Sequence, residues 1–319
     1  MNFTKYSIYV WFVLLYNLGV ILWGAYVRAT GSGAGCGNHW PLCNGEVIPR
    51  APQVETIIEY SHRLSSGIAL LLVLGLFIWG FRIFTKGHQV RIGVSFSLIF
   101  IITEALVGAG LVFFEWVAKD ASTGRVISIA VHLINTFLLL ASLTLTAWWA
   151  SGGKRLSLQG HGGWLIAFCL GFIGVIFIGI SGAITALGDT LFPTASLIEG
   201  IRQDINPSAH FLIRLRVWHP LIAISVGLYL ILLSGLLAFL DDNLRVKRFA
   251  GALIALFILQ LGAGLINLLL LVPVWMQIVH LLLADLVWIT LVLFAAVVFA
   301  ITELNLSNSG SLEKVSTEH

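Results

Sequence analysis

Eight long apolar segments dominate the sequence and leave few folds open to it. They lie near residues 7–27, 63–81, 92–114, 126–149, 164–187, 215–239, 249–272 and 275–301. A helix crosses a bilayer with about 20 apolar residues, whereas the strands of a membrane barrel alternate over about ten. Only 10% of the residues are charged, against about 25% in a soluble domain. The chain is therefore predicted to be an all-α integral membrane protein with eight transmembrane helices.

The charge distribution predicts how these helices are oriented. The net charge is only +3 and no basic stripe suggests nucleic-acid binding. Lysine and arginine in the N-terminus and in every second short loop predict that this side is cytoplasmic; they are Lys5, Arg82, Lys86, Arg91, Lys154, Arg155, Arg245, Lys247 and Arg248. The other side also carries basic residues, but in longer loops mixed with acidic ones. We expect a multi-pass protein of a bacterial cell membrane with both termini cytoplasmic, and a first segment retained as an anchor because it lacks a cleavage site.

The two halves of the chain repeat the same features in the same order. "WGAYVRATGSG" is echoed by "SGAITALGDT", "YSHRLSSGIALLLVLGL" by "RVWHPLIAISVGLYLIL", "EALVGAGLV" by "LQLGAGLIN" and "SIAVHLINTFLLLASLTL" by "MQIVHLLLADLVWITLVL". We expect two parallel four-helix bundles, residues 1–150 and 164–301, related by a pseudo-two-fold axis along the membrane normal. A cytoplasmic linker, residues 151–163, joins them, and residues 302–319 form a polar cytoplasmic tail.

Four of the nine histidines occupy equivalent places in the two halves. His62 and His219 open the second segment of their halves, and His132 and His280 lie about two turns into the fourth. A lone histidine in a membrane helix is commonly a helix contact, but the repeated placement favours ligands. Two imidazoles suit opposite sides of a haem iron, whereas zinc or non-haem iron would want carboxylates or cysteines as well. The pattern predicts two bis-histidine haem sites, one in each half.

A carboxylate distinguishes the first half from the second. Glu59 precedes His62 by three residues, and Leu215 stands near the matching position of the second half. This asymmetry suggests a reactive pocket in the first half and an electron-transfer pocket in the second. The alternative is that Glu59 only sits in the first helical turn, where a carboxylate suits the helix dipole.

Other charged residues lie near or within the apolar segments. Arg63, Arg214 and Arg216 stand near the outer ends of the histidine-bearing segments, where they could bind haem propionates or simply extend to the membrane interface. Glu104 and Asp285 are acids inside predicted helices, and the sequence does not name their partners.

The loop "GSGAGCGNHWPLCNG", residues 31–45, follows the first apolar segment. It holds Cys36 and Cys43 among glycines that permit tight turns, on the predicted outer and oxidising side. A disulfide is favoured, either as a structural staple or, if exposed and strained, as a redox group. A metal clip that adds His39 is weaker because it lacks a fourth ligand.

Taken together, "TGSGAGCGNHWPLCNG", "EYSHR" and the four histidines resemble haem A synthase over residues 7–301. The resemblance implies that the C8 methyl group of haem O is oxidised by successive hydroxylations to the formyl group of haem A, for the biogenesis of terminal oxidases. It implies that His62 and His132 flank the substrate haem O, that His219 and His280 hold haem B, and that Glu59 is an essential carboxylate.

The resemblance further implies that Cys36 and Cys43 relay reducing equivalents or tune the enzyme. It also implies haem O synthase and oxidase assembly factors as partners, in addition to membrane lipid. The resemblance is compatible with self-association of the chain. Some bacterial members carry a second cysteine pair in the outer loop at residues 188–214, and this chain has none there. We expect that loop to be a lid over the haem B site.

Three other functions compete with this one. A di-haem electron-transfer cytochrome b would also need paired histidines, although it would place haems near both membrane faces. A transporter would suit the parallel repeats, with glycine pairs Gly108–Gly110 and Gly262–Gly264 as hints of broken helices. A thiol oxidoreductase built on the loop cysteines would need more cysteines or a quinone.

Overall fold

The computed structural model describes residues 4–300, so the predicted polar tail, residues 302–319, lies outside the described residues. The described part is helical, with only two isolated β-bridges. Its helices are α1 (Lys5–Ala29), α2 (Val54–Ile83), α3 (Gln89–Phe113), α4 (Thr123–Ala150), α5 (Gly162–Leu191), α6 (Leu197–Asp204), α7 (Phe211–Leu215), α8 (Trp218–Leu240), α9 (Leu244–Leu269) and α10 (Val274–Val298). Eight helical stretches are long and apolar enough to cross a membrane, α7 and α8 forming one of them together. The predicted all-α membrane fold is confirmed.

Local chemistry sets several helix ends. The side chains of Thr4, Ser122 and Asn243 each accept a hydrogen bond from a backbone N–H in the first turn of α1, α4 and α9. Such caps satisfy donors that have no partner inside the helix. The break between α7 and α8 falls just before His219 and Pro220, and a proline is tolerated in the first turn of a helix.

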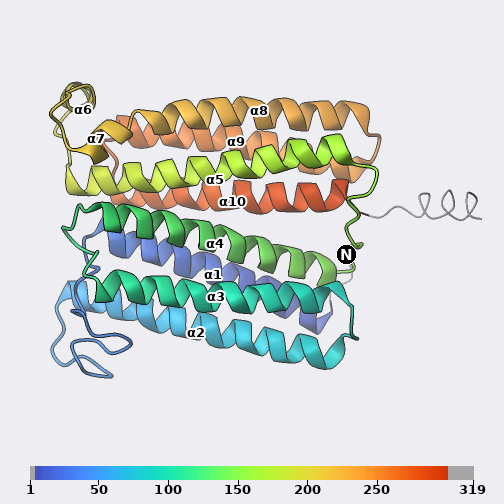
Figure 1. Cartoon of the computed structure of the whole chain (residues 1–319), viewed down its shortest axis with the longest axis horizontal. Helices are drawn as coiled ribbons and strands as arrows, with labels where there is room; N and C mark the ends of the chain where they lie inside the picture. The colour runs from blue at the N-terminus through green and yellow to red at the C-terminus, as the bar shows by residue number, and fades with distance from the viewer. Residues whose placement is uncertain (1–3, 301–319) are drawn as a thin grey trace, which may run out of the picture.

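The helices gather into two groups of four long helices that lie side by side (Figure 1). One group is α1 to α4, and the other is α5, α8, α9 and α10. Helices α4 and α10 meet in the middle, and their apolar stretches are 39% and 56% buried, against 17% for α3 and α5. Across this contact the indole of Trp288 donates to the carbonyl of Phe137 at 2.7 Å and stacks on its ring. The remaining helices therefore present most of their apolar surface outward, as lipid-facing helices do.

Helix α1 begins and α10 ends at the same end of the bundle (Figure 1). The cysteine loop and the α6–α7 segment lie at the opposite end, called here the loop end. Helices α2, α4, α8 and α10 all begin at the loop end, and each carries one of the four repeated histidines within its first ten residues. At about 1.5 Å per residue, these histidines lie within about 15 Å of the helix starts.

The linker of residues 151–163 packs against the end of α10. Its Ser157 N–H donates to the carbonyl of Phe299 at 2.8 Å, and Leu156 forms a β-bridge with Ala300. The indole of Trp148 donates to the carbonyl of Lys154. The connection between the two groups is thus held by α4, which precedes it, and by the end of α10.

Candidate functional site

The first turns of α2 place Glu59 beside His62. The helix begins at Val54, nine residues before the predicted start, after the extended residue Gln53. Glu55 is the acid of the first turn, where a carboxylate suits the helix dipole. Glu59 lies in the second turn, so the interpretation of Glu59 as a first-turn acid is wrong and its position needs another explanation.

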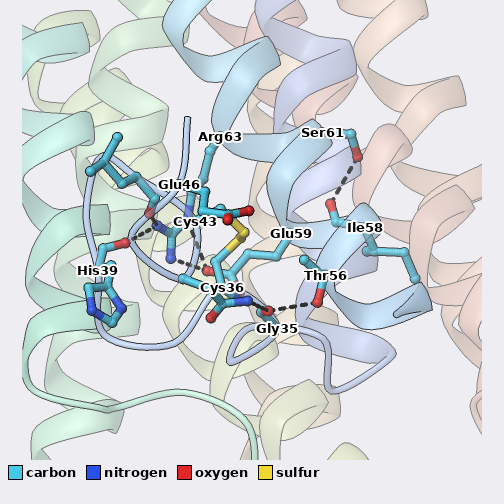
Figure 2. Close-up of a disulfide and its surroundings, with 12 residues drawn as sticks. Gly35, Cys36, His39, Cys43, Glu46, Thr56, Ile58, Glu59, Ser61 and Arg63 are labelled. Carbon is cyan, nitrogen blue, oxygen red and sulfur yellow. Dashed lines mark hydrogen bonds and ion pairs between the residues drawn. A yellow bond between two sulfur atoms is a disulfide. The ribbon is translucent and has the colours of Figure 1, made fainter. Parts of the chain in front are cut away.

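Hydrogen bonds from the cysteine loop and from its own helix hold Glu59. Its side chain is only 4% exposed. One carboxylate oxygen accepts from the backbone N–H of Cys36 at 2.8 Å, and the other accepts from Nε and Nη2 of Arg63, with Nε at 3.0 Å (Figure 2). The remaining amino group of Arg63 donates to the carbonyls of His39 and Leu42. Arg63, predicted as a propionate partner, is therefore engaged with Glu59 and the loop.

A disulfide and a glycine shape the loop above Glu59. Cys36 and Cys43 are bonded, as predicted, and both are almost fully buried. Their sulfur atoms bond to each other, so the metal clip with His39 is not formed. A Cβ on Gly35 would lie 2.4 Å from the carbonyl oxygen of Glu55, and Thr56 donates to the Gly35 carbonyl at 2.8 Å. Only glycine allows the loop to lie this close to α2.

Three of the four histidines pack directly against a glycine of a neighbouring helix, called here the seat glycine of that histidine. A Cβ added to any of these glycines would lie 2.9 to 3.0 Å from the imidazole Cε1 atom; the pairs are Gly24 with His62, Gly182 with His219, and Gly264 with His280. The first two glycines are the repeat-equivalent ones of "WGAYV" and "SGAIT". The repeated glycines thus place ligand-type side chains, in addition to allowing close helix packing.

The histidine pair of the second half has the spacing of two ligands on one metal. The ring centroids of His219 and His280 are 6.4 Å apart and their planes are perpendicular. A metal–imidazole bond of about 2 Å on each side, with about 1.2 Å from nitrogen to ring centre, gives roughly 6.4 Å. The hydroxyl of Ser181 lies 3.1 Å from Nδ1 of His219, leaving Nε2 for a metal. Nδ1 of His280 is buried without a hydrogen bond, and the amide of Gln260 lies 3.3 Å from its Nε2.

In the first half the two histidines differ from each other. Nδ1 of His62 is buried and has no hydrogen-bond partner among residues 4–300, which costs about 1–3 kcal/mol unless a ligand compensates. Nδ1 of His132 lies 3.3 Å from a carboxylate oxygen of Glu104, at ion-pair distance but without the angle of a hydrogen bond. The donor sets of both halves thus fit an iron porphyrin bound through imidazoles.

The two arginines before α8 have different surroundings. Arg216 is buried and donates to Asp189 at 2.9 Å and to Asp204 at 3.0 Å, which ties α5 and α6 to the start of α8. Burial raises the pKa of Asp204, and the Arg216 charge opposes that shift. Arg214 is exposed. Binding of propionates by either residue, and a lid role for residues 188–214, stay predictions.

Sequence reasoning missed Arg28 as a link between the halves. At the end of α1 it donates to the carbonyl of Ala186 at 2.8 Å, to the hydroxyl of Thr190 and to the amide oxygen of Gln277. These partners lie on α5 and α10 of the other half. The repeat contained a sign of this role, because Arg28 in "WGAYVRA" aligns with an alanine in "SGAITAL" and so has no charged equivalent in the second half. Asp285, the other intramembrane acid, is fully buried, and neither of its oxygens has a hydrogen bond within residues 4–300.

Comparison with known proteins identifies the family. A protein from Thermus thermophilus named "Protoheme IX farnesyltransferase" is 57% identical over 273 residues, which are 86% of this chain and 45% of that protein. "Heme A synthase" of Exiguobacterium sp. is 41% identical over 42% of this chain and 46% of its own length. "Heme A synthase" of Halalkalibacterium halodurans is 33% identical over 66% of this chain and 70% of its own. The chain thus spans just under half the length of the first two relatives.

The family profile named COX15-CtaA, described as "Cytochrome oxidase assembly protein", covers residues 7–292. This range contains Glu59, the cysteine loop and all four repeated histidines. The chain therefore belongs to the COX15-CtaA family.

Proposed function

We propose that this protein is a haem A synthase that oxidises the C8 methyl group of haem O to the formyl group of haem A. Two hydroxylations each replace a C–H bond of the methyl carbon by C–OH and remove two electrons from it, and loss of water from the resulting geminal diol gives the formyl group. The observation that carries the proposal is Glu59, a buried carboxylate one turn from His62 that has no counterpart in the second half. The relatives named "Heme A synthase" support the same reaction.

The first half would bind the substrate. His62 and His132 would flank haem O, and the farnesyl tail suits a site between helices that face lipid. The backbone N–H of Cys36 and the guanidinium of Arg63 fix both oxygens of Glu59. These donors favour the anionic form of Glu59, and a carboxylate held in this way would stabilise positive charge developing at the methyl carbon without first reorganising.

The second half would hold haem B through His219 and His280. When bound, haem B would supply one-electron transfer between the second half and the substrate site. The seat glycines and the Ser181 hydroxyl orient the two imidazoles for this role. The lack of a carboxylate like Glu59 in this half agrees with electron transfer in place of substrate oxidation.

The surroundings of the two sites complete the proposal. The loop end would face the outside and both termini the cytoplasm, in a bacterial cell membrane. The disulfide would hold the loop over Glu59, and reduction of Cys36 and Cys43 would release it. The Thermus thermophilus relative, of which this chain covers 45%, is named "Protoheme IX farnesyltransferase". It supports a haem O synthase as a partner, since farnesylated haem is the proposed substrate.

A di-haem electron-transfer cytochrome is the second candidate, because both halves carry similar histidine pairs. Expression in cells that make haem O but no haem A separates the two functions. We expect haem A in the extracted pigments, together with haem B bound to the protein. Haem B alone, with haem O left unchanged in the membrane, would contradict the synthase and support the cytochrome.

A further inference from the structure

We propose that Glu104 is a positioning residue for the first haem site, which orients His132 through Nδ1 and makes this iron ligand a stronger electron donor than its counterpart His280. The inference rests on the proposed binding of haem by the first half. It concerns an acid on α3 that the reaction described above does not use.

The contacts of Glu104 fix both of its oxygens next to His132. Oε1 accepts from the hydroxyl of Thr136 and lies 3.3 Å from Nδ1 of His132, while Oε2 accepts from the amide of Asn135. The Thr103 hydroxyl donates to the amide oxygen of Asn135 at 2.6 Å. The NH2 group of Asn135 also donates to the carbonyl of Phe100 at 2.9 Å, and since a carbonyl can only accept, this contact places the NH2 group on the side of the carboxylate. The amide of Asn135 donates to Glu104, and the hydroxyl of Thr136 shares its one proton between Glu104 and the carbonyl of His132, 2.9 Å away. These two donors suit a carboxylate that accepts.

The carboxylate of Glu104 lies at ion-pair distance from Nδ1 of His132, 3.3 Å away, which leaves Nε2 of this imidazole for a metal. Partners that accept from the second ring nitrogen of a metal-bound histidine fix the tautomer and the ring orientation, and they raise the basicity of the ligand. Hydrogen bonding around an axial ligand is one of the ways in which a protein sets the reduction potential of a haem. Glu104 would therefore favour the ferric state of the first-half iron.

The second half lacks this arrangement. When the "GAG" motifs of α3 and α9 are aligned, Gly110 with Gly264, the position of Glu104 holds Ile258. His280 instead has a neutral amide, Gln260, 3.3 Å from Nε2, and no partner at Nδ1. The second imidazole of that half, His219, has a neutral hydroxyl at 3.1 Å. A carboxylate at a ligand imidazole is thus a property of the first half.

The two halves also differ in the glycine that faces the histidine of the fourth long helix. Gly264 packs against His280, whereas a Cβ on the equivalent Gly110 would meet no atom within 4 Å. His132 is therefore not seated on a glycine of α3. Its orientation depends on Glu104 and the residues that hydrogen-bond to Glu104. We therefore expect the loss of Glu104 to displace His132 more than the other histidines.

A redox titration of the purified membrane protein tests the proposal, with haem B as the probe in both halves. Variants His132→Ala and His280→Ala assign each haem signal to its half. We expect Glu104→Gln to raise the midpoint potential of the first-half haem and to leave the second unchanged. Asp285→Asn, which removes a buried carboxylate that makes no hydrogen bond, is the matched control and should leave the first-half potential at the wild-type value.

Unchanged potentials in Glu104→Gln with normal haem content would overturn the proposal, as would an equal shift in Asp285→Asn. Loss of haem from both halves would also overturn it, since that result indicates a general packing role. If only the first half loses haem, with affinity reduced by about 10- to 100-fold, Glu104→Asp must restore binding, and failure to do so counts against the proposal. A wild-type protein that binds two haems but forms no haem A would refute the proposed function, and the potentials would still decide the role of Glu104.

Discussion

The glycine seat of His219 allows a prediction with a magnitude. In Gly182→Ala the new Cβ would lie 2.9 Å from Cε1 of the imidazole. Non-bonded carbon atoms rest about 3.5–4.0 Å apart, so the ring has to move by about 0.6–1.1 Å. Functional groups need placement within about 0.5 Å, and Ser181 resists the movement by its contact at Nδ1. We expect haem binding in the second half to weaken by about 10- to 100-fold, the range seen when support of a metal ligand is lost.

The assay measures the haem content of the purified protein and the binding of carbon monoxide to its reduced form. A haem iron with two histidine ligands leaves no position for carbon monoxide, so a displaced His219 should create new binding. Gly262→Ala is the matched control, because a Cβ there would meet no atom within 4 Å and alanine in a helix is favoured by up to about 1 kcal/mol. Wild-type haem content and no carbon monoxide binding in Gly182→Ala would refute the seat.

Three further predictions follow from named contacts. Glu59→Ala should abolish haem A formation while the reduced haem B band persists; loss of that band would instead assign Glu59 a structural role. Cys36→Ser should reduce haem A formation less than His62→Ala does, because the loop only supports Glu59 whereas His62 would hold the substrate, and the reverse order would make the cysteines central. Trp288→Phe removes one hydrogen bond between the halves and should lower the free energy of unfolding by about 1 kcal/mol; an unchanged unfolding midpoint in detergent would show that the bond contributes nothing.

Much of the architecture could be predicted from the sequence because bilayer-spanning helices need long apolar segments. The candidate histidine ligands were identified through the repeat, since a pattern present in both halves carries more information than any single residue. The disulfide was predicted correctly from two cysteines in a glycine-rich loop. Its burial was not, because burial depends on how the loop folds onto α2.

The contacts between segments could not be predicted. The start of α2 at Val54 depends on tertiary packing of Gly35 and Thr56, and apolar content alone placed it nine residues too late. Arg63 was predicted either to bind a propionate or to extend to the membrane interface, and the sequence gives no sign that it also contacts two loop carbonyls and Glu59. Likewise, Asn135 gives no sign in the sequence that it meets Glu104, since their contact joins two helices.

The proposed function requires that each half binds one haem between its two histidines. The most direct measurement is the number of haems per polypeptide combined with near-infrared magnetic circular dichroism, which identifies axial ligands, in the wild type and in His62→Ala and His219→Ala. We expect two haems with bis-histidine ligation when the protein is saturated, and loss of the signal of one haem in each variant. A single haem that disappears in both variants, or ligation by a residue other than histidine, would contradict it.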